Sequence, residues 1–202
     1  MISLPFRALC ALALAAWIAT GALAGAAAQR SEAAVFPIEG FYVGAFAGAI
    51  VVDSKVTLRG NGTQTSTRLR DTGAALGLRG GWGMRLTPGL YAGLELEGMF
   101  PIDVNSSYSA LGQTYRREIY SEIGAYGRLG WSPDGQSLLF LRAGTAASMG
   151  GDYPAFVAVI GAGAEMPISQ RLAGRVDVAY SFPFTRNHVE IYRLTAGVVL
   201  RF

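Results

Sequence analysis

The sequence predicts an all-β protein: a closed, antiparallel barrel of eight transmembrane strands in up-and-down order. Eight segments alternate between an apolar face and a small or charged face, with the period of two that strands have. The connections between these segments are alternately longer and shorter. The whole chain is 51% hydrophobic and only 15% charged, whereas average soluble domains carry about 25% charged residues. Strands with an apolar face toward lipid would account for this composition.

The first 28 residues are predicted to be a cleaved secretory signal peptide. Arg7 supplies the positive n-region, an apolar stretch runs from Leu9 to Leu23, and Ala26 to Ala28 form a small-residue cleavage site. The alternative is a retained membrane helix, but the stretch is shorter than the roughly 20 residues that a spanning helix needs. We therefore expect cleavage after Ala28.

Residues 29–40 are predicted to form a periplasmic N-terminal segment and residues 41–202 the outer-membrane barrel domain. The single cysteine, Cys10, leaves with the signal, so the mature chain has no thiol for a disulfide or a metal site. Its net charge of about +2 is too small to favour nucleic acid as a partner.

The first four predicted strands each set an apolar face against a face rich in glycine and charge. They cover residues 41–51, 72–86, 90–100 and 119–131. In the third strand Leu94 and Leu96 alternate with Glu95 and Glu97. That period of two is incompatible with a helical stripe and predicts a strand.

The last four predicted strands cover residues 138–145, 156–166, 171–182 and 189–202. The sixth of the eight is the weakest, because both of its faces are small or apolar. Lengths of about 9 to 13 residues suit tilted membrane-spanning strands. The even number suits a closed barrel, which leaves no unpaired backbone edge in lipid.

The connections predict the orientation of the barrel. Long polar loops are expected at residues 52–71 and 101–118, and medium loops at 149–155 and 183–188. Three short turns are expected at residues 87–89, 132–135 and 167–170. Bacterial barrels place short turns in the periplasm and longer loops outside.

Aromatic residues fall near both ends of the predicted strands, as the girdles of membrane barrels do. The periplasmic rim is expected to carry Phe41, Trp82, Trp131 and Phe202. The outer rim is expected to carry Phe100, Phe156, Phe182 and Tyr192. Two girdles favour a membrane barrel over a soluble sandwich.

The inward faces carry many charges in a lumen that is only wide enough for side chains. We predict a neutralising network that fills the barrel; a narrow charge-lined pore is the alternative. Its residues are Arg79, Glu95, Glu97, Glu122, Arg128, Arg142, Glu165, Arg175, Asp177, Arg193 and Arg201. Arg85 falls on the same inward set. Four inward glycines are expected to make room for the long arginines: Gly77, Gly81, Gly124 and Gly163.

No catalytic residue, metal site or cofactor is predicted. His188 is the only histidine, which excludes a site with several histidine ligands and leaves Ser-His-acid chemistry dependent on one loop residue. Gly161-Ala162-Gly163 lacks the third glycine of a dinucleotide fingerprint. We interpret it as a packing feature.

The chain from residue 36 onward resembles the small eight-stranded outer-membrane barrels: the OmpA membrane domain, OmpX and the porin-like surface proteins of alphaproteobacteria. The resemblance depends on the strand pattern, the loop lengths and the ending Tyr-Arg-Leu-Thr-Ala-Gly-Val-Val-Leu-Arg-Phe. It implies a monomer in the outer membrane of a Gram-negative bacterium. It also implies that the barrel-assembly machinery recognises the last strand, through a C-terminal signal of Tyr192, Leu194, Leu200 and Phe202.

The resemblance implies a set of roles. The first is a structural, envelope-integrity or surface-interaction (adhesion) protein that is not an enzyme, with a host or surface ligand left open. The alternative is a small porin for ions or solutes. A lipid A-modifying enzyme is less favoured, because the residues for its chemistry are missing.

Lipopolysaccharide is the expected lipid partner of the outer loops. The first loop is basic and the second ends in an arginine pair. Because arginine binds phosphate bidentately, the predicted lipopolysaccharide contact consists of Arg68, Arg70, Arg116 and Arg117. An ordinary solvated loop surface is the alternative.

Overall fold

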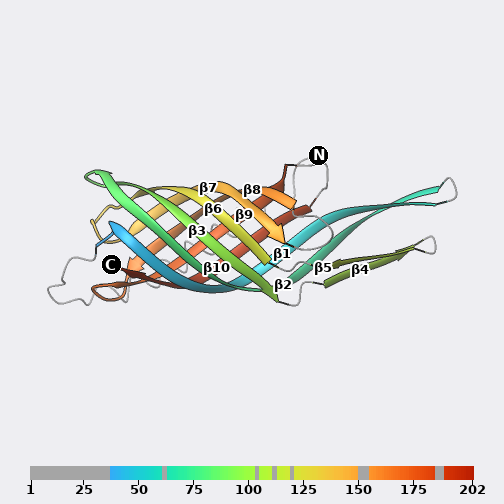
Figure 1. The fold of residues 1–202 in the computed structure, drawn as a ribbon, viewed down its shortest axis with the longest axis horizontal. Helices are drawn as coiled ribbons and strands as arrows, with labels where there is room; N and C mark the ends of the chain where they lie inside the picture. The colour runs from blue at the N-terminus through green and yellow to red at the C-terminus, as the bar shows by residue number, and fades with distance from the viewer. Residues whose placement is uncertain are drawn as a thin grey trace.

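Eight strands close into an antiparallel barrel in the computed structural model, which confirms the predicted fold class (Figure 1). The structure describes residues 37–60, 63–102, 105–110, 113–118, 121–149, 155–184 and 189–202, so the predicted signal peptide lies outside the described residues. The barrel strands are β1 (Gly40–Gly60), β2 (Thr63–Thr87), β3 (Leu90–Ile102), β6 (Ser121–Trp131), β7 (Leu138–Met149), β8 (Ala155–Pro167), β9 (Leu172–Pro183) and β10 (Val189–Arg201). None of the described residues forms a helix that could span a bilayer.

Consecutive barrel strands are neighbours, and the last strand pairs with the first. The β1–β10 register runs from Tyr42 opposite Arg201 to Ser54 opposite Val189. Closure of this seam pairs the backbone groups that would otherwise form two free sheet edges. In hydrocarbon, where water cannot satisfy such groups, closure is a requirement.

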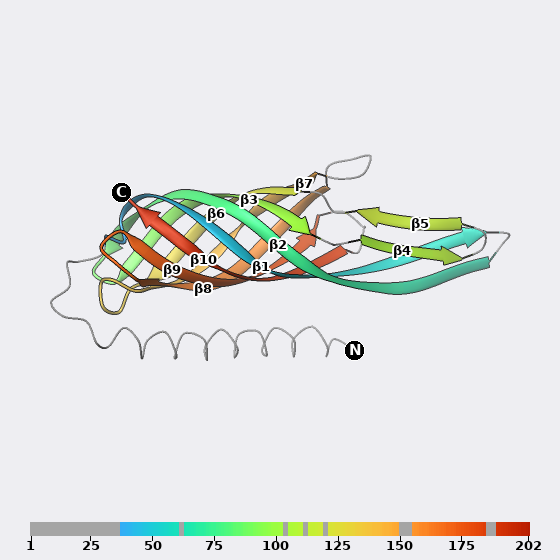
Figure 2. The ribbon, with the colours of Figure 1, turned by 90° about the horizontal axis from the view of Figure 1, so that it is seen from below.

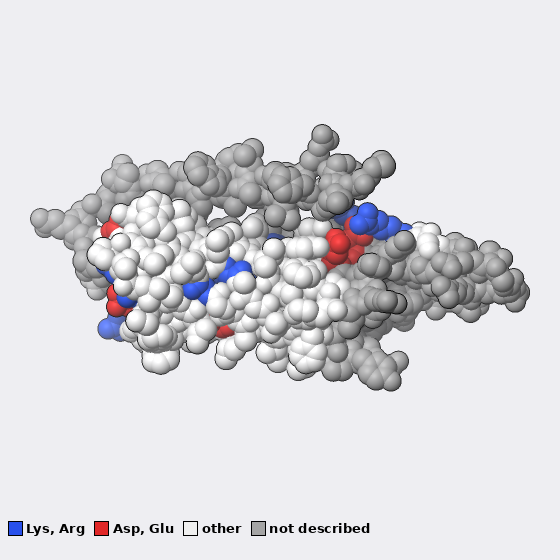
Figure 3. All heavy atoms as spheres, turned by 90° about the horizontal axis from the view of Figure 1, so that it is seen from above, with Lys and Arg blue, Asp and Glu red and all other residues white. Residues whose placement is uncertain are grey.

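The strand alternation turns apolar side chains outward and polar ones inward. Phe41 is 67% exposed and Leu94 is also 67% exposed, whereas the neighbouring Tyr42 and Glu95 are buried. On the face seen in Figure 3, uncharged residues accordingly cover most of the described surface. The polarity is thus the reverse of that of a soluble domain.

The exposed aromatics gather at both ends of the barrel. Phe41 and Trp82 are cross-strand partners close to the end with the short turns, and both are exposed. Trp131 and Phe202 are exposed at the same end, and Phe100, Phe156 and Phe182 at the opposite end. Tyr192 is only partly exposed.

Short turns join the strands at one end. Gly89, after β2, and Gly135, after β6, have positive φ angles of 92° and 73°, which glycine adopts without strain. Asp134 accepts hydrogen bonds at Oδ1 from the N–H groups of Gln136 and Ser137, at 2.9 and 2.6 Å, and at Oδ2 from the Ser137 hydroxyl, at 2.8 Å. Partial burial opposes ionisation of Asp134, but these hydrogen bonds outweigh it and hold the pKa of the carboxyl below its usual value.

The prediction of long loops at residues 52–71 and 101–118 is wrong for most of their length. β1 and β2 continue past the barrel as a paired hairpin, from Asp53 opposite Arg70 to Gly60 opposite Thr63. Within 101–118, β4 (Asn105–Ala110) and β5 (Gln113–Glu118) form a separate two-stranded sheet. Both hairpins project beyond the same end of the barrel (Figures 1 and 2). These stretches are more polar than the barrel strands, but antiparallel pairing satisfies their backbone groups.

Candidate functional site: a charged lumen

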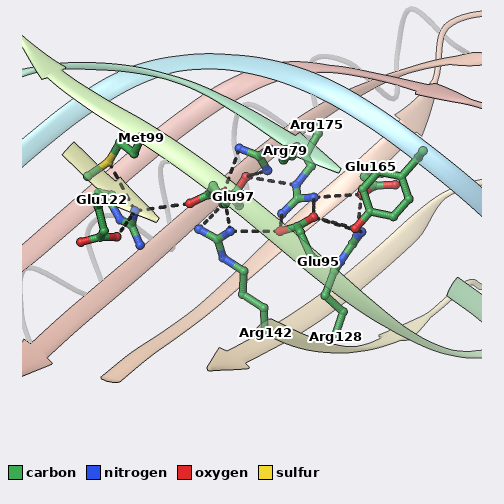
Figure 4. Close-up of polar contacts among 12 residues, drawn as sticks. Arg79, Glu95, Glu97, Met99, Glu122, Arg128, Arg142, Glu165 and Arg175 are labelled. Atoms are coloured by element: carbon green, nitrogen blue, oxygen red, sulfur yellow. Dashed lines mark hydrogen bonds and ion pairs between the residues drawn. The ribbon is translucent and has the colours of Figure 1, made fainter. Parts of the chain in front are cut away.

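One network of ion pairs fills the middle of the barrel (Figure 4). Six arginines and five carboxylates from seven of the eight barrel strands form it, and all eleven residues are buried. They are Arg79, Glu95, Glu97, Glu122, Arg128, Arg142, Glu165, Arg175, Asp177, Arg193 and Arg201. The structure therefore brings together every charged residue that the alternation placed in this network.

Glu95 on β3 lies at the centre of the network. It pairs with Arg142 at 3.1 Å, with Arg128 at 3.5 Å, and with Arg175. The Tyr42 hydroxyl donates to Glu95 Oε2 at 2.7 Å and accepts from Arg128 Nη1 at 2.7 Å. Tyr42 thereby links β1, which contributes no charge to the network, to its central carboxylate.

Two further carboxylates connect the strands on either side. Asp177 on β9 pairs with Arg79 at 2.8 Å, with Arg142 at 3.0 Å and with Arg175 at 3.2 Å. Glu97 on β3 pairs with Arg142 at 2.7 Å and with Arg79 at 3.6 Å. Each of these carboxylates thus faces two or more guanidinium groups, as a charge taken out of water requires.

The two ends of the network are closed by different partners. Toward the short turns, Glu165 pairs with Arg128 at 2.5 Å and with Arg201. Arg201 Nη1 also donates to the backbone carbonyl of Ile38, at 2.5 Å. Toward the opposite end, Arg193 pairs with Glu122 at 2.9 Å and with Glu97 at 3.3 Å.

Aromatic rings separate the like-charged guanidinium groups. The Phe140 ring lies 4.1 Å from the Arg128 guanidinium carbon and 4.5 Å from that of Arg175. The Phe46 ring lies 4.2 Å from the guanidinium carbon of Arg79. These are cation–π distances, and such contacts strengthen when they are desolvated.

The four inward glycines predicted to make room for arginines lie against aromatic rings instead, so that prediction is wrong at these positions. Arginines pack over two other inward glycines: a Cβ at Gly44 would lie 3.3 Å from Arg79 Cγ, and one at Gly161 would lie 3.2 Å from Arg142 Nε. A Cβ at Gly77 would contact the Phe46 ring, one at Gly81 the Tyr42 ring, and one at Gly124 the Tyr126 ring. At Gly163 it would lie 2.6 Å from Phe140 Cζ and 2.6 Å from the Asp177 Cβ. A side chain at any of these four positions would clash with a rigid ring, and glycine avoids the clash because it has no Cβ.

Four clusters of buried apolar side chains pack around the charges in the lumen. At the short-turn end, two clusters contain Ile38, Tyr42, Ala173 and Val199, and Tyr91, Leu138 and Phe140. At the other end, two clusters contain Phe46, Ile50, Val52, Ala75, Met99 and Ile191, and Tyr126, Ala146, Val157, Val159 and Ala179. Some of these side chains are cross-strand partners of the charges, as Tyr126 is of Glu95 and Ile50 is of Arg193, so apolar groups and paired charges fill the lumen together.

Arg85 does not belong to the network, although the alternation placed it on the inward set. Its side chain is 36% exposed at the rim, where Nε lies 3.3 Å from Glu39 Oε1. The alternation of β2 still holds at Arg85, but the strand has reached the mouth of the barrel there.

The residues of the predicted lipopolysaccharide contact are divided between two hairpins. Arg68 and Arg70 are exposed on β2, and Arg68 Nε donates to Asp53 Oδ1 at 2.7 Å. Arg116 and Arg117 lie on β5, where they pair with Ser107 and Ser106. Because successive residues of a strand lie on opposite faces, Arg116 and Arg117 do not share a face.

The remaining positions considered from the sequence are the C-terminal signal and His188. Tyr192, Leu194, Leu200 and Phe202 lie on the outward side of β10, and the Phe202 N–H donates to the carbonyl of Phe41 at 3.0 Å. His188 lies outside the described residues.

Sequence reasoning missed Tyr42 and the Ile38 carbonyl as members of the network. The inward position of Tyr42 in β1 was a usable signal, whereas nothing in the sequence marked the carbonyl.

No family model matches the sequence, and no curated protein matches it either. Among solved structures, the chain is similar to Neisserial surface protein A (TM-score 0.47, 16% identity, 81% of this chain and 97% of that one). It is also similar to Ail, the attachment invasion locus protein of Yersinia pestis, in complex with the heparin analogue sucrose octasulfate (0.44, 11%, 82% and 100%). A third is the N-terminal β-barrel domain of Pseudomonas aeruginosa OprF (0.43, 13%, 77% and 97%). These likenesses concern the barrel fold, which the strand pairing of this chain establishes by itself.

Proposed function

We propose that this protein is an integral outer-membrane barrel of a Gram-negative bacterium with a filled, non-conducting lumen. Its role is structural: it anchors the β1–β2 and β4–β5 hairpins at the cell surface, where they are available for contact. It acts as a monomer and not as an enzyme. The observation that carries the proposal is the network of buried, paired charges that fills the middle of the barrel.

The outward face supports the placement in a membrane. Large apolar side chains such as Leu78, Leu96 and Leu141 are each 64% exposed along the wall. In water this surface would favour association or aggregation. In a bilayer it matches the apolar band of a transmembrane barrel, and the exposed aromatics at both ends match its two interfaces.

The interior supports a closed lumen. An ion crossing the barrel would pass Glu95 and Asp177, each of which pairs with three arginines. Separating a buried pair leaves an uncompensated charge and costs about 3–5 kcal/mol. The ion would also meet the buried apolar side chains packed around the charges, and an apolar constriction excludes water from a pore.

Assembly is proposed to proceed through the last strand. The outward positions of Tyr192, Leu194, Leu200 and Phe202 on β10 form an apolar row that the barrel-assembly machinery could recognise before the barrel closes. Closure then pairs β10 with β1.

Single-channel conductance of the refolded mature protein in a planar bilayer tests the proposal. We expect no current steps, with insertion verified independently by protection of the barrel from protease added to one side. Stable, salt-dependent steps would overturn the closed lumen and make the small porin the function. A change in the mass of lipid A on expression would instead identify the protein as a lipid-modifying enzyme.

A further inference from the structure

The part of the β1–β2 hairpin beyond the barrel, residues 53–60 and 63–71, has all its basic residues on one face. We call this part the extension. Cross-strand partners lie on the same face of an antiparallel pair. The register places Asp53 opposite Arg70, Lys55 opposite Arg68, and Arg59 opposite Gln64. Lys55, Arg59, Arg68 and Arg70 therefore share one face of the extension.

The opposite face of the extension carries no basic residue. Its cross-strand partners are Ser54 and Leu69, Val56 and Thr67, and Leu58 and Thr65. The strand alternation connects this face to Tyr42 and Phe46, which point into the lumen. The basic face, in contrast, continues the outward wall of the barrel that begins with Phe41, Val43 and Ala45.

Rows of residues across β10, β1 and β2 show where the outward wall changes character. One row is Leu194, Ala49 and Ala74, and the next toward the extension is Tyr192, Val51 and Thr72. The following row is Glu190, Asp53 and Arg70, and above it Lys55 pairs with Arg68. The wall thus passes from apolar through aromatic to charged residues within a few rows.

This order matches the layers of a lipid leaflet. Aromatic side chains favour the interface between hydrocarbon and headgroups, and basic groups lie at the level of the headgroup phosphates. Tyr180 and Tyr192 have ring centroids 4.9 Å apart, and the Tyr192 hydroxyl donates to Glu190 Oε2 at 3.0 Å. The hydrocarbon boundary on this side of the barrel therefore lies next to the Tyr192 row, directly below the basic face.

Arg68 and Arg70, which lie on this face, are accessible to anions. The Arg68 side chain is 70% exposed although Nε contacts Asp53. The hydrogen bond and the charge of Asp53 raise the pKa of Arg68, so it stays cationic. Arg70 is also exposed. Two arginines on adjacent rows of one strand can each offer a planar fork to phosphate oxygens.

We propose that the outward basic face of the extension binds the phosphate groups of the anionic lipid in the outer leaflet, such as those of lipid A. This inference rests on the proposed membrane placement and identifies the partner of one hairpin. Charge complementarity and continuity with the apolar wall favour lipid over a soluble polyanion. Arg116 and Arg117 lie on β5, in the separate two-stranded sheet, so they are not part of this surface.

The test measures binding of bis-phosphorylated lipid A to the folded mature protein in a neutral detergent, by native mass spectrometry. The Arg68→Gln/Arg70→Gln variant is compared with the charge-matched Arg116→Gln/Arg117→Gln variant. We expect the first to bind at least about tenfold more weakly, since it loses the charge-assisted hydrogen bonds of two guanidinium groups to phosphate. The second should bind within about twofold of the parent.

Two further binding measurements distinguish recognition of lipid phosphates from recognition of soluble phosphate. Dephosphorylated lipid A should bind the parent protein weakly, and millimolar inorganic pyrophosphate should compete only in part. Equal loss in both arginine variants, or no loss in either, would overturn the proposal. So would complete displacement by pyrophosphate, because the site would then be a soluble-anion site.

The folded state is checked by the gel shift of the unheated protein. If Arg68→Gln/Arg70→Gln does not fold, Arg68→Lys/Arg70→Lys is used in its place. Lysine keeps the positive charge but cannot bind phosphate bidentately as the planar guanidinium does. Binding by the lysine variant should fall between that of the parent to lipid A and that of the parent to dephosphorylated lipid A, and parent-level binding would contradict bidentate recognition. The absence of current steps in a planar bilayer does not depend on lipid A binding. If the lipid-binding test fails, the proposed closed lumen is therefore unaffected.

Discussion

Strand β1 has two regions with one backbone geometry and opposite side-chain polarity. Within the barrel it directs Phe41 and Val43 outward and Tyr42 inward; in the extension the same alternation puts Lys55 on the outward face and Val56 on the other. Pairing with β2 continues without a register shift from Gly40 to Gly60. The comparison shows that the hydrogen-bond ladder does not decide which face is apolar. In the proposed placement the surroundings decide it: hydrocarbon contacts the wall of the barrel, whereas headgroups and water contact the extension.

The largest expected effect comes from removing the central carboxylate of the lumen. Glu95→Gln leaves Arg128, Arg142 and Arg175 short of one negative charge in a buried site. We expect the free energy of unfolding to fall by about 3–5 kcal/mol, measured by urea titration in lipid vesicles with tryptophan fluorescence.

Glu39→Gln is the control for this experiment. Glu39 also pairs with an arginine, Arg85 at 3.3 Å, but both side chains are partly exposed at the rim. Its removal should cost less than about 1 kcal/mol. Unchanged midpoints for Glu95→Gln would show that the lumen charges contribute nothing to stability.

An arginine introduced at one outward position of β1 within the barrel, or at another in the extension, tests this comparison directly. Ala45 lies on the outward face within the barrel, and Thr57 lies on the continuing face in the extension. Ala45→Arg should lower the free energy of unfolding in a bilayer by about 2–4 kcal/mol, because it puts a charge in hydrocarbon. Thr57→Arg should change it by less than about 0.5 kcal/mol. Equal tolerance of both substitutions in vesicles would remove the argument that lipid surrounds the wall.

Alanine substitutions at two glycines, one facing the lumen and one facing outward, test whether the inner face of the wall is packed more tightly than the outer face. A Cβ at Gly163 would lie 2.6 Å from Phe140 Cζ and 2.7 Å from the carbonyl oxygen of Val176, whereas one at Gly98 would meet nothing within 4 Å. Gly163→Ala should therefore destabilise the barrel by about 1–3 kcal/mol through overpacking. Gly98→Ala should be neutral or slightly stabilising, since it only reduces the freedom of the unfolded chain. The same urea titration measures both, and the reverse order of stability would refute a tightly packed lumen.

The smallest effect is expected at a short turn, away from both regions of β1. Asp134 has a lowered pKa in the folded state, so its contribution is present above its unfolded pKa and is lost as the pH falls through its folded pKa. Asp134→Asn should cost less than about 1 kcal/mol at neutral pH, because the site is exposed. The difference from the parent should narrow in acid and disappear below the folded pKa. A difference that stays constant down to that pH would show that the carboxylate charge has no part in the turn.

Much of the barrel could be predicted because lipid imposes a strict pattern. The predicted strand at residues 156–166 is observed at Ala155–Pro167, and the one at residues 171–182 at Leu172–Pro183. The prediction failed where the chain leaves the apolar wall. A polar sequence outside lipid can pair as a strand or remain a loop, and the pattern of apolar residues does not distinguish the two.

The sequence alone determined which charged residues lie on the inward side of each strand, since side chains in a strand alternate with a period of two whatever the fold; only the structure shows that Arg85 is at the rim and not in the lumen. The sequence did not determine their partners. Glu95 and Arg175 are 80 residues apart, and only the register and closure of the barrel bring them together. The same holds for the glycines: their inward position follows from alternation, but that they lie beneath aromatic rings depends on which residues the curved wall places opposite one another. Side-chain direction is a local property of the backbone, whereas contact across a lumen depends on every strand pairing around it.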